Sequence, residues 1–204
     1  KDLRGKRVGV WLGSWEAQFD ALMAQQGISS QDFSLVPQGY SMTPFLNDEL
    51  DVASAMSYNE YYTILENGIR PEELDVIDYA DFGLDFPGDT LFTSRAQVEQ
   101  DPDLCVRMVR ASLRGWQYAI EHPEEAADII LKYDQTGVQT RAHQLSMMTE
   151  IAKLVLPAGS QLGRSDDAVV QKTIDTLLQF NILKGSVNPM DVITNEIWEK
   201  AQDK

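Results

Sequence analysis

The chain has few cysteines, few basic residues and no long apolar run, and each shortage excludes a class of protein. Its 204 residues include one cysteine, Cys105, which excludes an internal disulfide and a cysteine-rich metal site. No stretch approaches the roughly 18 apolar residues that a membrane span requires. Only 17 Lys and Arg stand against 32 Asp and Glu, and the resulting net charge of −15 disfavours nucleic acid and anionic membranes as partners.

Groups that commonly carry out catalysis or bind metals are also scarce. The two histidines, His122 and His143, have no nearby cysteine and no nucleophile motif around them. The chain has no phosphate-binding loop, no complete dinucleotide glycine pattern and no His/Cys spacing typical of a metal site. The acidic residues around His122 are typical of a solvated helix face. The sequence therefore predicts a binding protein rather than an enzyme, without catalytic residues, metal or cofactor.

The remaining composition, 43% hydrophobic and 24% charged, is that of a globular chain with a core. The first 80 residues alternate β-rich runs with amphipathic runs, which predicts a mostly parallel sheet with helices on its faces. Ser14 is predicted to cap the first helix and Gly27 to end it. The predicted strands are 7–12, 33–37, 51–56 and 74–79, and further helices are predicted over 43–50 and 59–68.

The pattern changes after Phe82. A passage rich in glycine and proline leads to a predicted single strand at 89–94, and nearly everything beyond it is predicted to be helical. Asp101 and Pro102 form a clear helix start, and Trp116 lies on the apolar stripe of that helix as a predicted core residue. Further helices are predicted from Pro123, over 139–155, from Ser165 and around Ile197.

Ligands of open parallel sheets bind beyond the carboxyl ends of the strands, where loops and helix N-termini meet. Four segments of this chain meet that description, and they combine aromatic rings with hydrogen-bonding side chains. Such a surface suits a flat ring rich in nitrogen. The candidate ligand-binding residues are Trp15, Glu16, Gln38, Tyr40, Tyr58, Asn59, Glu60, Tyr79 and Phe82.

The charge of these segments narrows the ligand class. Glu16 and Glu60 would place carboxylates beside two predicted helix N-termini, where an anionic ligand would otherwise bind. A neutral or cationic heterocycle is therefore favoured over an anion. The alternatives stay open, because acidic residues in a first helical turn are favourable without any ligand, and Asn59 would serve equally as a simple N-cap.

Several stretches of the chain resemble one known family. The opening Asp2-Leu3-Arg4-Gly5-Lys6-Arg7-Val8-Gly9-Val10 resembles the segment that begins the second lobe of NMT1/THI5-like periplasmic substrate-binding proteins, which serve ABC importers. The resemblance continues through residues 36–39, 51–61, 106–120 and 123–126. It implies a type II periplasmic-binding-protein fold, whose two α/β lobes close on a small molecule and hand it to a membrane permease. It also implies a periplasmic or extracytoplasmic location, free or lipid-anchored.

The same resemblance bears on the ligand. Members of the family bind thiamine-pyrimidine precursors, riboflavin or alkylsulfonates. Relatives that bind sulfonates tend to carry small hydroxyl residues where this chain has Trp15 and Glu16, so a planar heterocycle is favoured, with the riboflavin type slightly ahead. The alternatives are a sulfonate-like solute and a ligand-sensing domain of a signalling protein. A pyrimidine synthase of the THI5 type is disfavoured by the shortage of histidine.

In the family, residues that form most of the first lobe precede this opening segment, so we expect the sequence to be a fragment, or a domain cut from a larger chain, in which the signal sequence is not included. We therefore expect a second lobe in residues 1–82, a hinge at 83–94, and a helical part at 95–204 that completes the first lobe. If the rest of the first lobe is missing, apolar surface is exposed and self-association becomes possible. We also expect this chain alone to bind its ligand weakly.

Overall fold

A computed structural model describes residues 3–13 and 15–202 of the chain. The chain divides into two compact units. Unit 1 comprises Lys1–Pro87 and Ala168–Val187, and unit 2 comprises Gly88–Asp167 and Asn188–Lys204. The boundary near residue 88 falls inside the predicted crossover. Residues 168–187, in contrast, belong with the N-terminal part and not with the other helices.

Unit 1 is built around a small parallel sheet. Strand β1 (Arg7–Val10) pairs in parallel with β2 (Ser34–Pro37), with Arg7 opposite Ser34 and Val10 opposite Pro37. On its other edge β1 bonds to the segment after Asp51: Gly9 N–H donates to the Val52 carbonyl at 2.8 Å, and Val8 and Val52 form a single parallel bridge. The predicted parallel arrangement is confirmed, although the third predicted strand is reduced to this bridge.

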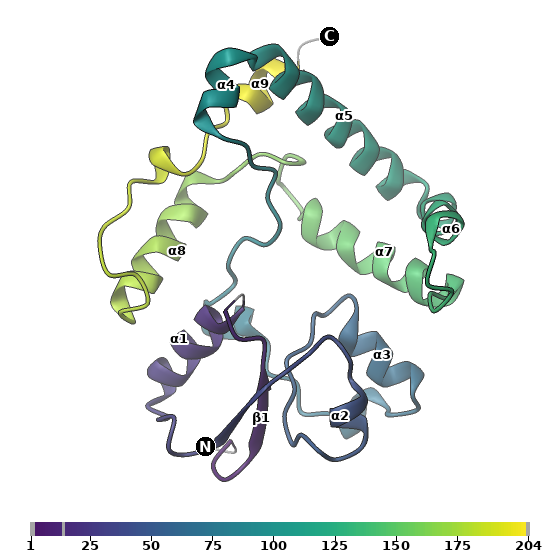
Figure 1. Cartoon of the computed structure of the whole chain (residues 1–204), viewed down its shortest axis with the longest axis vertical. Coiled ribbons are helices and arrows are strands. Elements are labelled where there is room, and N and C mark those ends of the chain that lie inside the picture. Colours follow the sequence, from purple (N-terminus) through teal and green to yellow (C-terminus); the bar gives the residue numbers. More distant parts are fainter. Residues whose placement is uncertain (1–2, 14, 203–204) are drawn as a thin grey trace. The chain divides into compact units, whose positions relative to one another are not determined.

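Helices flank both sides of β1. Helix α1 (Glu16–Gln26) lies on one side, and α2 (Thr43–Leu46) and α3 (Glu60–Glu66) lie on the other (Figure 1). Gly27 ends α1 in the left-handed conformation, with φ of 63°, as predicted. Ser14, the predicted cap, lies outside the described residues. Two 3-10 turns, η1 (Pro71–Glu73) and η2 (Tyr79–Phe82), and helix α8 (Asp167–Gln179) follow later in the chain.

Two predicted strands are wrong. Neither 74–79 nor 89–94 forms a strand, and most of their large apolar residues are exposed, with Ile77 at 46% and Phe92 at 90% of full exposure. β-rich runs become strands only when a neighbouring strand takes up their backbone hydrogen bonds, and none does so here among the described residues. At the end of the first run, the Asp78 side chain accepts from Ala80 N–H and starts η2 instead.

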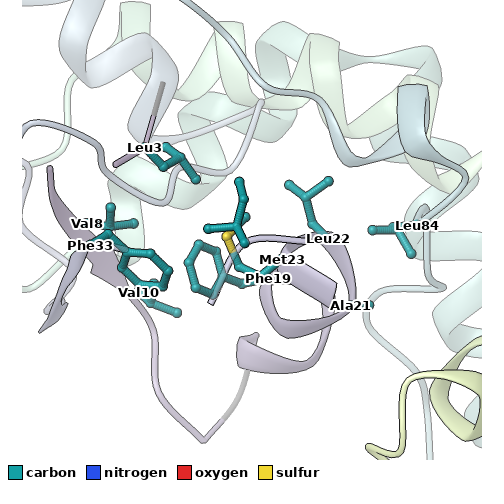
Figure 2. Close-up of a cluster of buried hydrophobic side chains, with 10 residues drawn as sticks. Leu3, Val8, Val10, Phe19, Ala21, Leu22, Met23, Phe33 and Leu84 are labelled. Carbon is teal, nitrogen blue, oxygen red and sulfur yellow. The ribbon is translucent and has the colours of Figure 1, made fainter. Parts of the chain in front are cut away.

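The core of unit 1 lies between β1 and α1. Figure 2 shows side chains of α1, among them Phe19, pointing toward Val8 and Val10 of β1 and toward Phe33. The rings of Phe19 and Phe33 meet edge to face, with their centroids 5.5 Å apart. Phe180, just after α8, also packs against this core. That contact explains physically why α8 belongs to unit 1.

Unit 2 is helical in the part that the structure describes. The predicted helix starts are confirmed at Asp101, whose side chain accepts from Leu104 N–H at 2.9 Å, and at Pro123. Helix α5 packs against α9, and α6 packs against α7. Trp116 on α5, a predicted core residue, is 40% exposed and therefore lies outside the set of buried residues. The elements are α4 (Arg95–Gln100), α5 (Pro102–Glu121), α6 (Pro123–Tyr133), α7 (Arg141–Val155), η3 (Pro189–Asp191) and α9 (Glu196–Gln202).

None of the helices in the described part of the chain combines the length and the apolar composition needed to cross a bilayer.

Candidate ligand-binding rim

Three loops of unit 1 follow parallel segments and therefore emerge at the same edge of the sheet. The first follows β1, the second follows β2, and the third follows the segment that bonds to β1 through Val52. We call these loops the rim, and it consists of residues 11–13, 15–16, 38–43 and 54–60. The carboxyl edge of a parallel sheet is the usual place for a ligand in such folds.

The first rim loop holds Trp15 and Glu16 at the start of α1. Trp15 precedes the first helical residue and is half-buried. Its backbone N–H donates to the Trp11 carbonyl at 3.3 Å. Glu16 accepts from Gly13 N–H at 3.0 Å through Oε2. This carboxylate therefore closes the loop on itself and sits at the positive end of the helix dipole.

The second rim loop is fixed by two side chains. The indole Nε1–H of the buried Trp11 donates to the Gly39 carbonyl at 3.1 Å. The side-chain amide of Gln38 bonds to Ser54, with Nε2 donating to the Ser54 carbonyl at 2.7 Å and Oε1 accepting from Ser54 N–H at 2.8 Å. Tyr40, between these anchors and α2, is 90% exposed. Its ring is thus presented to solvent on an anchored loop.

The third rim loop turns around a buried carboxylate. Glu60 is 5% exposed, and it accepts from Met56 N–H and from the Asn59 side-chain amide, both at 3.0 Å. Asn59 stands at the N-cap position of α3, but its side chain makes no capping hydrogen bond. Glu60 therefore holds the loop that carries the half-buried Tyr58.

The last two candidates, Tyr79 and Phe82, lie on η2 beside α1 and not on the rim. Gln25, in the last turn of α1, donates to the Phe82 carbonyl at 3.3 Å, so Phe82 lies at the end of α1 opposite Glu16. Tyr79 packs against the core, where burial, with Asp20 nearby, raises its pKa to about 12. Phe82 also lines a cavity of about 330 Å³ between α1 and α8.

The rim is aromatic and acidic. None of its residues is a lysine, arginine or histidine. Carboxylates occupy the first turns of both α1 and α3, so neither helix start is left for an anion. Elsewhere, too, residues 3–13 and 15–202 contain no group of three His, Cys, Asp or Glu side chains placed to hold a metal ion. The rim can offer ring faces and hydrogen-bond acceptors to an uncharged molecule.

Three residues that shape the rim were missed by the sequence analysis, namely Gly9, Trp11 and Ser54. Trp11 was assigned only to a strand, and Ser54 carried no signal of its own. Gly9 did carry one, because a glycine inside a strand often marks the close approach of another group. An added Cβ there would lie 2.5 Å from Gln38 Oε1.

Comparisons with known proteins agree with this architecture. The family model described as NMT1/THI5 like matches residues 1–126. The riboflavin-binding protein RibY of Chloroflexus aurantiacus is 28% identical over 207 residues, which cover 96% of this chain and 56% of that protein. The structure of SsuA from Methylobacillus flagellatus KT, described as a periplasmic sulfonate-binding protein of a sulfonate ABC transporter, has a TM-score of 0.56 at 13% identity, covering 98% of this chain and 60% of that one. The chain thus spans little more than half the length of either.

Proposed function

This chain belongs to the NMT1/THI5-like family, and from that premise we propose that it binds a small solute outside the cytoplasm and delivers it to an ABC permease. The similarity to RibY and the likeness in fold to SsuA support this role. Both relatives are solute-binding proteins, which favours a binder over an enzyme.

We also propose a type II periplasmic-binding-protein fold, with residues 1–82 in the second lobe, 83–94 as the hinge and helices of 95–204 completing the first lobe. The likeness in fold to SsuA supports the architecture. Because α8 belongs to unit 1, we keep residues 168–187 with the α/β part in this assignment.

The proposed ligand is a small planar heterocycle, neutral or cationic, such as riboflavin or a thiamine pyrimidine. The observation that carries this proposal is the composition of the rim, which has exposed or half-buried aromatic rings and two carboxylates but no cationic side chain. A sulfonate would need a cation or a vacant helix N-terminus. Glu16 and Glu60 occupy the starts of α1 and α3, and the third rim helix, α2, has only four residues, with its first N–H, on Thr43, bonded to Ser41 Oγ at 3.2 Å. The ring of the ligand would stack on an aromatic face, for which Trp15 and Tyr40 are placed.

The hydrogen-bonding edge of such a ligand would be met by side chains beside these rings. Glu16 retains Oε1, for which no hydrogen bond is found within the described chain, and it lies next to Trp15. Tyr58 and Asn59 are half-buried in the third loop and complete the proposed contacts. Tyr79 and Phe82 stay predicted contacts that lie outside the rim.

A titration followed by tryptophan fluorescence tests the proposal. The 204-residue chain is titrated with riboflavin, with the thiamine pyrimidine and with methanesulfonate, with free tryptophan as the correction for light absorbed by the ligand. We expect saturable quenching by one heterocycle, with weak affinity, and none by the sulfonate. In Trp15→Phe the quenching amplitude should fall sharply.

The matched control is Trp116→Phe, which removes a tryptophan of unit 2 at 40% exposure. It should leave the affinity and the ligand-dependent change unchanged. Saturation by methanesulfonate, or quenching that depends on Trp116 and not on Trp15, would overturn the proposed ligand class. Tight binding measured by calorimetry would contradict the expected weak affinity.

We further propose that the chain self-associates through unit 2. Large apolar side chains on α5 and α6 are exposed there, among them Met108 at 56% and Ile130 at 51%. Sedimentation velocity over a range of concentrations should give a rising average mass. A constant monomer mass over the whole range would exclude this proposal.

A further inference from the structure

The side chain of Gln38 acts in this structure as if it were a peptide group. Strand β2 ends at Pro37, and Gln38 N–H makes one more bond to the Val10 carbonyl at 3.0 Å. The side-chain amide then reaches across β1 to Ser54, where it donates at 2.7 Å and accepts at 2.8 Å. It thereby joins the second rim loop to the third, across the strand that separates them.

Space for this amide exists because residue 9 is a glycine. A Cβ at Gly9 would lie 2.5 Å from Gln38 Oε1 and 2.8 Å from Leu50 Cδ1, and both distances are too short for real contacts. The Ser54 hydroxyl also donates to the Gly9 carbonyl, at 3.0 Å. Gln38, Gly9 and Ser54 form one connected unit, which we call the amide clamp.

The amide clamp uses the hydrogen-bonding capacity of Gln38 within the protein. Nε2 donates to the Ser54 carbonyl and lies 3.9 Å from Met42 Sδ, and Oε1 accepts from Ser54 N–H. Both bonds to Ser54 are made inside the protein, which leaves only the second lone pair of Oε1 and the N–H that faces Met42 for any other partner. Gln38 is half-buried, which is compatible with a contact to the ligand and with a purely structural role. Its two hydrogen bonds to Ser54 favour the structural role.

We propose that Gln38 is a positioning residue: through the amide clamp it holds the loop with Tyr40 and the loop with Tyr58 in the relative placement that the ligand requires, without touching the ligand. This inference rests on the proposed function of the rim. Loops that are ordered before binding cost the ligand less conformational entropy, so loss of the clamp should weaken binding while the contacts themselves survive.

Gln38→Glu gives a test that depends on pH. A protonated glutamic acid has one O–H donor and one carbonyl acceptor and can replace the amide against Ser54. The ionised form has no donor and faces the Ser54 carbonyl with negative charge, so the clamp opens. The groups around the amide are Ser54, Met42, Gly9 and Leu50, none of which titrates near neutral pH.

The rim carboxylates, Glu16 and Glu60, are bonded elsewhere, and the wild-type titration corrects for them. At pH 7.5 the riboflavin dissociation constant of Gln38→Glu should be about tenfold higher than that of the wild type, the effect of losing one hydrogen bond. The half-buried site and the Ser54 carbonyl disfavour the ionised form and so raise the pKa of this carboxyl above the usual value of about 4.3, and at pH 5 part of the affinity should return. Gln38→Met, which cannot titrate, should be weakened equally at both pH values, and the wild type should change little.

Hydrogen exchange at the Ser54 amide supplies a readout that needs no ligand. Ser54 N–H also donates to the Gly9 carbonyl at 3.2 Å, so its exchange should be slow in the wild type and faster, but still partly protected, in Gln38→Met, while circular dichroism shows both proteins folded. If exchange rises but riboflavin affinity stays that of the wild type, or if Gln38→Glu shows no recovery at pH 5, the positioning role is overturned. If the wild type binds no riboflavin, the proposed function fails, and the exchange result still decides whether the clamp exists.

Discussion

The two units of this chain differ in how much apolar surface they bury. In unit 1 a continuous core joins Val8 and Val10 of β1 to Phe19 and Leu22 of α1, all at or below 6% exposure. In unit 2 the buried apolar residues of the described chain are few and mostly small, namely Cys105, Ala127, Ile197 and Ala201. The helices of unit 2 form readily, but they bury little against one another.

The difference shows that a sequence can form stable helix starts without also forming a large buried core. Unit 2 has well-marked helix starts, such as Asp101 before Pro102, so its helices form from local signals. Unit 1 has short elements that depend on one another, because β1 contributes to the sheet and to the core at once. Stability in unit 1 therefore rests on tertiary packing, and the following changes test that contrast.

The largest effect on the free energy of unfolding is expected from a substitution in the core of unit 1. Phe19→Ala should lower the free energy of unfolding by about 3–5 kcal/mol, because the ring is 6% exposed and packs edge to face on Phe33. Ile130→Ala on α6, at 51% exposure, should change it by about 0.5 kcal/mol or less. Urea denaturation followed by circular dichroism measures both. Equal losses would remove the distinction between the units.

Alanine substitutions at two glycines should change the free energy of unfolding in opposite directions. Gly9→Ala places a Cβ against Gln38 and Leu50 and should cost about 1–3 kcal/mol through overpacking. Gly115→Ala, in the middle of α5 with open space around it, should stabilise the chain by about 0.5–1 kcal/mol, because alanine favours the helix. The same denaturation experiment compares them. A stabilising Gly9→Ala would contradict the close approach of the Gln38 amide.

Removing an ion pair is expected to have a smaller effect on the stability of the fold. Asp51 accepts from the Arg7 backbone N–H at 2.7 Å and from its guanidinium at 2.9 Å, and the pKa of Asp51 is held well below its usual value. Such a group stabilises the fold above the unfolded-state pKa of about 3.9, and that contribution is lost as the pH falls below it.

Asp51→Asn should therefore lower the unfolding midpoint at pH 7 and flatten its decline below pH 4. The matched change is Asp103→Asn, which removes an exposed pair with Arg107 on α5 and should cost no more than about 0.5 kcal/mol. Urea midpoints between pH 2.5 and 7 check both variants. If the urea midpoint of Asp51→Asn varies with pH in parallel with that of the wild type, ionisation of Asp51 does not contribute to the pH dependence of stability.

The sequence predicted features with local causes and missed those with distant ones. Capping residues and glycine predicted the helix starts at Asp101 and Pro123 and the end of α1 at Gly27. The alternation of β-rich and amphipathic runs predicted the parallel pairing of β1. The run 74–79 has the composition of a strand, but a strand depends on a partner from elsewhere in the chain, and none pairs with it among the described residues.

The candidate site shows the same limit. The rule that ligands bind at the carboxyl edge of a parallel sheet predicted Trp15, Tyr40 and Tyr58 as ligand contacts. These three residues lie in the rim loops at that edge, and their contact with a ligand stays a prediction. It also grouped Phe82 with them, although the hydrogen bond from Gln25 keeps Phe82 at the far end of α1. The bond between Gln38 and Ser54 joins residues 16 positions apart through a side chain, and no periodic pattern signals such a contact.

The central claim, that the rim binds a planar heterocycle, is tested most directly by mapping riboflavin-induced shifts in the amide and indole NMR spectrum of the labelled chain. We predict saturable shifts at the Trp15 indole and at the backbone amides of Tyr40, Tyr58 and Asn59, with those of Phe82 and of α5 unchanged. Shifts confined to the cavity beside Phe82 or to unit 2 would contradict the account.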